Sequence, residues 1–462
     1  MRVESALITL HNHTIQTVTP LSRSAFEAQA THRDFAVTDL GHQLLSPSFV
    51  NGHTHLAMVA LRGLELKALE GNVMESLYYL VESHMHAEDV RAFVRLGAYE
   101  SLLAGVGACW DHYYHAEAIA QGMLDVGICG TVAPTLQDRG GPGQDQWQSA
   151  LNITQALSEK HQFTQAGIYP VLGPHATDTV SPTLWQAVRE LAESKGLPIH
   201  CHLSQSLEEY ERIQEQNQLS PVAYLKQQGI LELEVPLILV HSLLLNQQDM
   251  ALLSPERHIL GYCPFSQLQF GFPAPAEQWW QQGFKVQVGT DAGACNDTMN
   301  VQQDLRALAV GNSFGVTTGD IFQGFQATPQ GKDSTVQAKA VYQQRAHFLH
   351  QRPNQGQILD SVWSVPGQSS PDLKLGEIAP GLRANFNLFN RHHPGLWPAS
   401  DPLRALIMGN ATAALNNVMI NGEWKGKPEH GFQDQILNSN AYQTAREEAD
   451  QRLSLLLRRC GL

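Results

Sequence analysis

Two histidines separated by a single residue, His53 and His55, follow directly on a short apolar run near the start of the chain. If this run continues as a β-strand through His55, both side chains point to the same side, because alternate residues of a strand share a face. Two imidazoles that face one cavity suit the binding of a single metal ion. The chain contains 21 histidines, so this pair is weak support for a metal site unless other residues join it.

Seven further segments with strand-like patterns follow, and helical patterns separate most of them. They lie at residues 107–111, 127–132, 166–172, 198–202, 236–241, 258–263 and 285–291. With the strand before His53 there are eight, and this alternation of strands with helices predicts a parallel α/β fold. Eight is the number of strands that closes a (β/α)8 barrel.

Polar residues collect at the C-terminal ends of these segments. Six of the eight run into a His or Asp, the third and the seventh being the exceptions; the residues are His53, His55, Asp111, His175, His202, His241 and Asp291. In barrel enzymes this end of the strands carries the catalytic residues. The pattern therefore predicts one shared site, since polar residues with only structural roles would scatter along the strands.

The regions on either side of these segments differ from them in character. Residues 1–45 contain short strand patterns, and strand patterns return at residues 376–389 and 417–424, the latter with an Asn-Gly hairpin signal. From these patterns we expect three parts: a small β-sandwich domain formed by both ends of the chain (residues 1–45 and 368–435), a TIM-like barrel (residues 46–367) and a C-terminal helix (residues 436–462).

The composition argues against several classes of protein. A formal net charge of −14 without a basic stripe argues against nucleic acid as a partner. The sequence contains no run of about eighteen apolar residues, so we expect no membrane-spanning helix. The six cysteines are scattered without a Cys-x-x-Cys motif. This indicates reduced thiols in a cytoplasmic protein rather than disulfides or a structural zinc site. We expect a small-molecule substrate as the partner, and assembly into a homo-oligomer is left open.

Taken together, the ordered motifs resemble the amidohydrolase superfamily, in its branch of adenosine, methylthioadenosine and S-adenosylhomocysteine deaminases, guanine deaminases and triazine hydrolases. The motifs extend over nearly the whole chain. They are Pro47-Ser-Phe-Val-Asn-Gly-His-Thr-His-Leu, Leu61-Arg-Gly, Trp110-Asp-His-Tyr-Tyr-His, Gly173-Pro-His, His202-Leu-Ser-Gln-Ser, Val240-His-Ser, Cys263-Pro-Phe-Ser, Gly289-Thr-Asp-Ala-Gly and Gly376-Glu-Ile-Ala-Pro-Gly.

The resemblance implies one divalent metal ion, held by His53, His55, His202 and Asp291. Three imidazoles and a carboxylate suit Zn²⁺, the usual metal of the family, or Fe²⁺. His200 is an alternative to His202, but the residues that follow His202 match the family motif. Relatives with two metals bridge them through a modified lysine on the fourth strand, and residues 168–175 contain no lysine.

Three more residues receive roles from the resemblance. His241 polarises the group that is attacked or positions the water, and His175 contacts the substrate. Glu82 matches, by its spacing from the His-x-His pair, a carboxylate that binds ribose hydroxyls in adenosine-type members. The alternatives are a buried core histidine for His241 and an ordinary solvated glutamate for Glu82.

One departure concerns the chemistry directly. The deaminases carry a proton-shuttling glutamate three residues after the ligand histidine of the fifth strand, and this chain has Gln205 there. An amide keeps the shape of a carboxylate but cannot carry the proton, and general acid–base catalysis is typically worth about 10²–10⁴-fold. We therefore expect a metal-dependent hydrolase that most often deaminates a nitrogen heterocycle. The alternatives are hydrolysis of another leaving group at carbon, and a catalytically weak protein that binds a small ligand.

Overall fold

The computed structural model describes residues 5–29, 37–64, 77–311, 353–427 and 431–462. Two sequence expectations fall outside these ranges, wholly or in large part: a helix with a loop in the glutamine-rich segment 317–353, and a short strand at residues 35–37. No helix in the described ranges is both long and apolar enough to cross a membrane.

The predicted strands are present, and they are parallel where they pair with one another. They are β4 (Phe49–His55), β5 (Val106–Tyr113), β6 (Cys129–Leu136), β7 (Ile168–Pro170) with β8 (Gly173–Pro174), β9 (Ile199–Leu203), β10 (Leu237–His241), β11 (His258–Tyr262), and β12 (Lys285–Val288) with β13 (Asp291–Ala292). Nearly every residue in these strands is buried. This explains why they appear in the sequence as apolar runs rather than as alternating patterns.

The strands pair as two parallel sheets. One has the order β13-β4-β5-β6-β7, with β8 also beside β6, and the other has the order β12-β11-β10-β9. A single parallel bridge between Leu172 and Ile199 joins them on one side. On the other side only residues 289 and 290 separate β12 from β13, so the chain itself passes from one sheet to the other. The pairing of the described strands thus does not form one continuous closed ladder.

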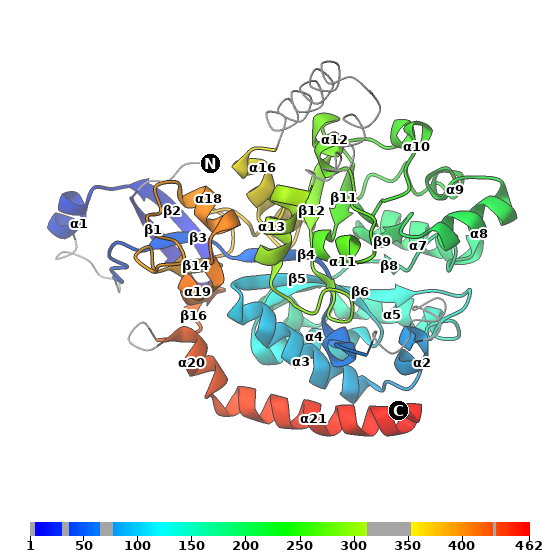
Figure 1. The fold of residues 1–462 in the computed structure, drawn as a ribbon, viewed down its shortest axis with the longest axis horizontal. Helices are drawn as coiled ribbons and strands as arrows, with labels where there is room; N and C mark the ends of the chain where they lie inside the picture. Colours follow the sequence, from blue (N-terminus) through cyan, green and yellow to red (C-terminus); the bar gives the residue numbers. More distant parts are fainter. Residues whose placement is uncertain (1–4, 30–36, 65–76, 312–352, 428–430) are drawn as a thin grey trace, which may run out of the picture.

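Helices connect the strands and cover them on the outside (Figure 1). They are α3 (Ala87–Leu103), α4 (Ala116–Val126), α5 (Trp147–Leu157), α6 (His161–Ala166), α7 (Pro182–Lys195), α8 (Leu207–Asn217), α9 (Pro221–Gln227), α10 (Gln247–Leu252), α11 (Pro264–Gln269), α12 (Ala276–Gln281) and α13 (Val301–Gly311). Two of these helices, α7 and α9, begin at a serine N-cap followed by a proline. Ser181 and Ser220 each accept a backbone N–H as N-caps, and each is followed by a proline at the first helical position.

Strands from both ends of the chain meet in a separate, antiparallel sheet, at the left of Figure 1. Its order is β16 (Glu423–Trp424), β15 (Leu415–Ile420), β14 (Phe386–Phe389) and β3 (Leu44–Pro47). The Asn421-Gly422 turn joins β15 to β16 with positive φ at both residues, 52° and 79°, which confirms the predicted hairpin. Of the strand predicted at residues 376–389, only β14 forms.

A two-stranded hairpin, β1 (Ala6–His11) with β2 (Thr14–Pro20), lies against this sheet. Thr14 forms a bridge with Arg383, and the backbone N–H of Ile15 donates to the carbonyl of Leu382 at 2.9 Å. Buried side chains of Ile15, Ala384, Phe386 and Met419 form a small core separate from that of the parallel sheets. The N-terminal strands therefore contact residues near the other end of the chain, while the β-sandwich and the domain boundaries stay predictions.

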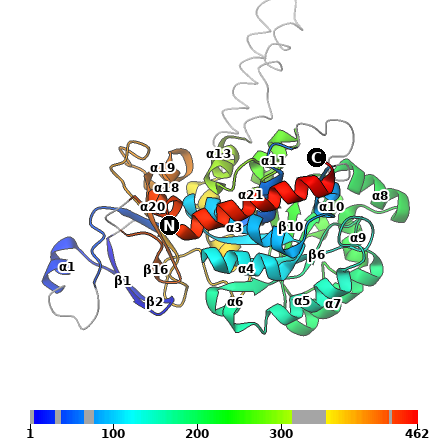
Figure 2. The same cartoon turned by 90° about the horizontal axis from the view of Figure 1, so that it is seen from below.

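The remaining elements are short, apart from one long helix. They are α1 (Arg23–Gln29), η1 (Leu56–Leu61), α2 (Tyr79–Glu82), α16 (Gln355–Asp360), α17 (Ser364–Gln368), α18 (Pro402–Met408), α19 (Ala411–Ala414), α20 (Phe432–Leu437) and α21 (Asn440–Cys460). The long helix α21 runs along α3 (Figures 1 and 2). Arg459 on α21 contacts the buried carboxylate of Asp89 at 2.6 Å, and Tyr442 packs edge-on against Tyr99.

Two glycines let β4 approach the β12–β13 connection. A methyl group at Gly289 would overlap the backbone N and O of His53, and one at Gly52 would overlap Gln287 and the backbone of Val288. Both glycines have ordinary φ values, so space rather than backbone strain requires them here. The close approach brings the strand that ends in His55 beside the strand that begins with Asp291.

We predict that Gly289→Ala destabilises the protein by about 1–3 kcal/mol or more, because the added methyl meets backbone atoms that cannot move aside without shifting His53. Thermal or urea unfolding measures this. Gly431→Ala is the matched control, since a methyl there has space and the residue is exposed. Equal stabilities for the two variants would contradict the account of this packing.

Candidate active site

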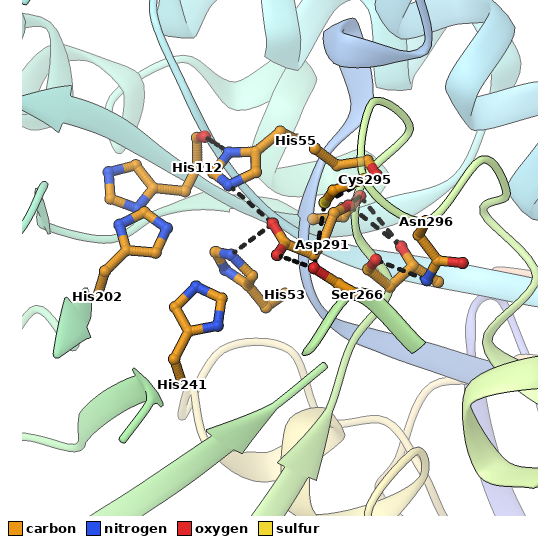
Figure 3. Close-up of polar contacts among 12 residues, drawn as sticks. His53, His55, His112, His202, His241, Ser266, Asp291, Cys295 and Asn296 are labelled. Carbon is orange, nitrogen blue, oxygen red and sulfur yellow. Dashed lines mark hydrogen bonds and ion pairs between the residues drawn. The ribbon is translucent and has the colours of Figure 1, made fainter. Parts of the chain in front are cut away.

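Five predicted side chains converge at the C-terminal ends of three strands and at the start of β13, just after β12 (Figure 3). They are His53 and His55 from β4, His202 from β9, His241 from β10, and Asp291 from β13. Ligand-type atoms of His53, His55 and Asp291 lie within 4.8 Å of one another, and so do those of His53, His202 and His241. The two groups share His53, so all five residues surround one small volume.

The backbone is strained at two of these residues. His241 has φ of 73° and Asp291 has φ of 62°, in the left-handed region that residues other than glycine rarely adopt. Such conformations cluster at functional sites, where surrounding contacts hold them in place. Here they turn the chain at the ends of the strands, and both side chains face the common volume.

Hydrogen bonds to backbone carbonyls orient two of the imidazoles. The Nδ1 of His202 donates to the carbonyl of His175 at 2.7 Å, and the Nδ1 of His55 donates to the carbonyl of His112. Because a carbonyl can only accept, each Nδ1 must carry the hydrogen, which leaves each Nε2 with a free lone pair. This is the usual arrangement of histidines that bind a metal.

His53 carries the clearest sign of a missing partner. Its Nε2 is fully buried and has no hydrogen-bond partner among the residues the structure describes, and it lies 3.7 Å from Oδ1 of Asp291. The Nε2 of His55 lies 3.5 Å from the same oxygen. Three imidazoles and a carboxylate that face one point fit a divalent cation such as Zn²⁺.

The pKa shifts of His53, His202 and Asp291 agree with this donor set. For His55, burial lowers the pKa, but contacts with Asp291 outweigh burial and raise it above its usual value. Burial lowers the pKa of His53 to about 3 and holds the pKa of His202 well below its usual range, so both rings are neutral. Burial opposes ionisation of Asp291, but contacts with His53 and His55 outweigh it and hold the pKa of this carboxyl well below its usual range. Neutral imidazoles and an ionised carboxylate are the forms that bind metals.

His200, the alternative ligand, lies behind His53 rather than beside it. Its Nε2 is 3.0 Å from Nδ1 of His53, the ring nitrogen that points away from Asp291. A ring nitrogen of His202 instead lies within 4.8 Å of ligand-type atoms of His53 and His241. The geometry therefore favours His202 over His200, and the ligand assignment itself stays a prediction.

Side chains from the β11 end support Asp291 and His241. The Ser266 hydroxyl donates to Oδ2 of Asp291 at 2.8 Å, and the Gln267 amide lies 2.9 Å from Nδ1 of His241. Cys263 contributes a buried thiol within 4.8 Å of ligand atoms of His241 and Asp291. These contacts fix one carboxylate oxygen of Asp291, while the other faces His53 and His55.

The two predicted substrate-binding residues, Glu82 and His175, are both buried. Glu82 ends α2 and is buried; burial raises its pKa to about 7 against the opposing effects of Tyr113 and His55. The ring of His175 packs against those of His202 and Tyr79. Glu82 is thus not the solvated glutamate that the sequence left as an alternative.

Asp111 and Gln205 have different surroundings. A carboxylate oxygen of Asp111 accepts the backbone N–H of Leu56 at 2.6 Å, so Asp111 stabilises the turn after His55. Gln205 follows β9 and is half-buried, and its backbone N–H donates to Oε2 of Glu209 at 2.9 Å. The catalytic role of Gln205 therefore stays a prediction.

Three residues near the site were not predicted: His112, Thr177 and Glu209. The ring of His112 stacks on His202 at 4.9 Å, and buried Glu209 accepts hydrogen bonds from Thr177 and from the backbone of Gln205. Burial raises the pKa of Glu209 to about 7. The Ser206-x-x-Glu209 spacing, typical of a helix N-terminus, could have drawn attention to Glu209. His112 acts through its backbone carbonyl, for which spacing gives no signal.

Comparison with known proteins assigns this site to a family. The model of the amidohydrolase family matches residues 44–323, more than half of the chain. The chain belongs to the amidohydrolase family. Among curated proteins, this amidohydrolase is 24% identical over 379 residues to a 5-methylthioadenosine/S-adenosylhomocysteine deaminase from Aquifex aeolicus, covering 82% of the chain and 80% of that protein. It is 30% identical over 279 residues to a 5'-deoxyadenosine deaminase from Methanothrix thermoacetophila, covering 60% and 65%.

Solved structures show the fold of this amidohydrolase. An adenosine deaminase from Xanthomonas campestris with bound Zn superposes with a TM-score of 0.75 at 21% identity, over 98% of this chain and 94% of that one. An atrazine chlorohydrolase from Arthrobacter aurescens in complex with zinc gives 0.76 at 18% identity, over 98% and 96%. These likenesses identify the parallel strands and helices as the TIM-barrel fold of amidohydrolases.

We predict that the protein binds one divalent ion per chain, since the ligand-type atoms surround one volume and no lysine follows Ile168 on the fourth strand. Elemental analysis after zinc supplementation measures the stoichiometry. His53→Ala should abolish binding, whereas His258→Ala, at a buried histidine away from the site, should retain the ion. Two ions per chain, or none in the unmodified protein, would contradict the assignment.

Proposed function

We propose that this amidohydrolase is a zinc-dependent enzyme that deaminates an aminated nitrogen heterocycle by hydrolysis. The observation that carries the proposal is the convergence of His53, His55, His202 and Asp291, with two Nε2 atoms left free by bonds to carbonyls and a third buried without a partner. The deaminases among its relatives, and the zinc in its structural neighbours, support the reaction and the metal.

The bound ion would supply acidification of water and stabilisation of developing negative charge. The residues of the chain would do the rest. Ser266 holds Oδ2 of Asp291, so that Oδ1 faces the centre, where the carboxylate would take part in proton transfer. His241 faces the same volume from β10, where it can donate a hydrogen bond to the group that leaves the ring carbon. His175 and Glu82 would hold the heterocycle and its substituent.

Because Gln205 replaces the glutamate that carries the proton in deaminases, Asp291 and His241 would transfer the proton in this protein. An amide at that position can orient a water or a ring nitrogen through hydrogen bonds, but it cannot carry a proton. Asp291 is ionised. Burial lowers the pKa of the neighbouring His241, and the charge of Asp291 opposes this shift. These two residues are the groups of the described centre that we assign to the shuttle.

A second reaction is favoured by the same residue: hydrolysis of another leaving group, such as halide or alkylamine, that needs no proton from a glutamate. One structural neighbour is named an atrazine chlorohydrolase, and this name describes hydrolysis with a halide as the leaving group. A variant of that enzyme with glutamate replaced by glutamine was crystallised with zinc and atraton. That variant of the neighbouring enzyme therefore still binds zinc and a ligand.

The wider setting follows from other features. The six cysteines are all free, five of them buried, which supports a reducing, cytoplasmic location. We propose that the barrel closes between β4 and the β12–β13 connection, where Gly289 lies against the backbone of His53. We propose that the β-sandwich consists of the antiparallel sheet, formed by both ends of the chain, and the N-terminal hairpin.

The direct test is ammonia release across purines, nucleosides, pterins and triazines, with chloride and alkylamine release measured on matched compounds. We expect ammonia from at least one aminated heterocycle, lost in His53→Ala and on treatment with a chelator. Turnover of halogenated or alkylamino compounds alone would favour the second reaction. No turnover of any compound by zinc-loaded protein would contradict both.

We predict that Gln205→Glu raises the turnover of poorly used aminated heterocycles by a factor of about ten or more, because it restores a general base. If the native reaction needs no shuttle, the new charge near Asp291 will lower its rate instead. Gln214→Glu, the same substitution on the exposed face of α8, is the control. Rates identical to the unmodified protein on every substrate would place residue 205 outside the site.

A further inference from the structure

Three predicted ligand histidines are oriented through Nδ1, and one of them differs from the others. His55 and His202 donate to backbone carbonyls, whereas Nδ1 of His53 meets the ring of another histidine, His200, at 3.0 Å. Backbone carbonyls are unaffected by substitution. The partner of His53 is therefore the one orienting group of the three that a mutation can remove.

The contacts of His200 hold its ring rigidly in the interior. It lies on β9 two residues before His202, is fully buried, and its backbone N–H donates to the carbonyl of Leu172 at 2.8 Å. Its ring packs edge-on against Trp110 at 5.5 Å and edge-on against His53 at 5.0 Å. The His53 ring thus has a fixed neighbour on the side away from Asp291.

The hydrogen positions of the two rings are linked. If Nε2 of His53 binds a metal ion, its hydrogen must be on Nδ1, and Nε2 of His200 must then accept. The opposite arrangement, with His200 donating, would place the hydrogen of neutral His53 on Nε2 and block the atom that faces Asp291. Only one pair of tautomers is therefore compatible with a metal on His53.

We propose that His200 is a positioning residue for the metal centre: it holds His53 in the orientation and tautomer that bind the ion, without contacting the ion itself. This inference rests on the metal centre of the proposed function and is independent of the substrate. The Nδ1 of His200, buried and without a hydrogen-bond partner in the described part of the chain, is where its own hydrogen must lie.

The test is zinc affinity, measured by competition with a chromogenic chelator on protein whose folding is checked by circular dichroism. His200→Phe keeps a ring but removes the acceptor, and the dissociation constant for zinc should rise by about 10–100-fold, the range for lost orienting partners. His200→Gln, which offers an acceptor oxygen, should recover part of the loss. In cobalt-substituted protein, the visible absorption of the Phe variant should also change.

His258→Phe is the matched control. His258 is equally buried, and its ring nitrogens lie within hydrogen-bond distance of the backbones of Leu231 and Ser254, at the far end of β11. This variant should lose stability but keep its zinc affinity. Folded His200→Phe with unchanged zinc affinity would overturn the proposal.

A second measurement decides the matter if His200→Phe does not fold. In zinc-loaded, ¹⁵N-histidine-labelled protein, the ring spectrum of His200, assigned through the Gln variant, should show its hydrogen on Nδ1. A hydrogen on Nε2 would overturn the proposal. Absence of zinc binding by the unmodified protein would remove the metal centre and the proposed function with it, whereas tight binding in all His200 variants would remove this inference alone.

Discussion

An imidazole nitrogen can hold a proton or a metal ion but not both, and the interior of this protein is arranged around that constraint. The carbonyls of His112 and His175 accept hydrogen bonds from Nδ1 of His55 and His202. The ring of His200 lies where it can accept one from Nδ1 of His53. Burial keeps the rings of His53 and His202 neutral, and Asp291 is ionised beside them. The contacts that orient these three rings thus all come from the chain itself.

The fold supplies this organisation through short distances between strands. Gly289 lets the connection from β12 to β13 touch the backbone of His53, and the left-handed conformation of Asp291 then turns its carboxylate toward β4. Each ligand-type residue lies within or at one end of a buried strand, where pairing with neighbouring strands limits its movement. Preorganisation of this kind is what lets a site act on charge that develops during a reaction.

Much of this could be predicted from the sequence, for identifiable reasons. Buried parallel strands are apolar runs, so β4 to β12 were visible, and residues that follow them, such as His241, were expected at one end. The prediction of His202 rather than His200 depended on the residues that follow His202, since both histidines point the same way from β9. Nor could the orienting carbonyls be predicted, because a backbone group leaves no trace in residue type. The predicted strand at residues 376–389 shrank to β14 because its preceding residues form turns.

X-ray absorption spectroscopy of the zinc-loaded protein tests the central claim most directly, because it reports the atoms around the ion. Binding by His53, His55, His202 and Asp291 predicts nitrogen and oxygen neighbours at about 2.0–2.2 Å, with the multiple-scattering pattern of imidazole. A sulfur neighbour at about 2.3 Å would instead place the ion on Cys263, and a second metal nearby would indicate a two-metal site. Either result would contradict the arrangement described for this centre.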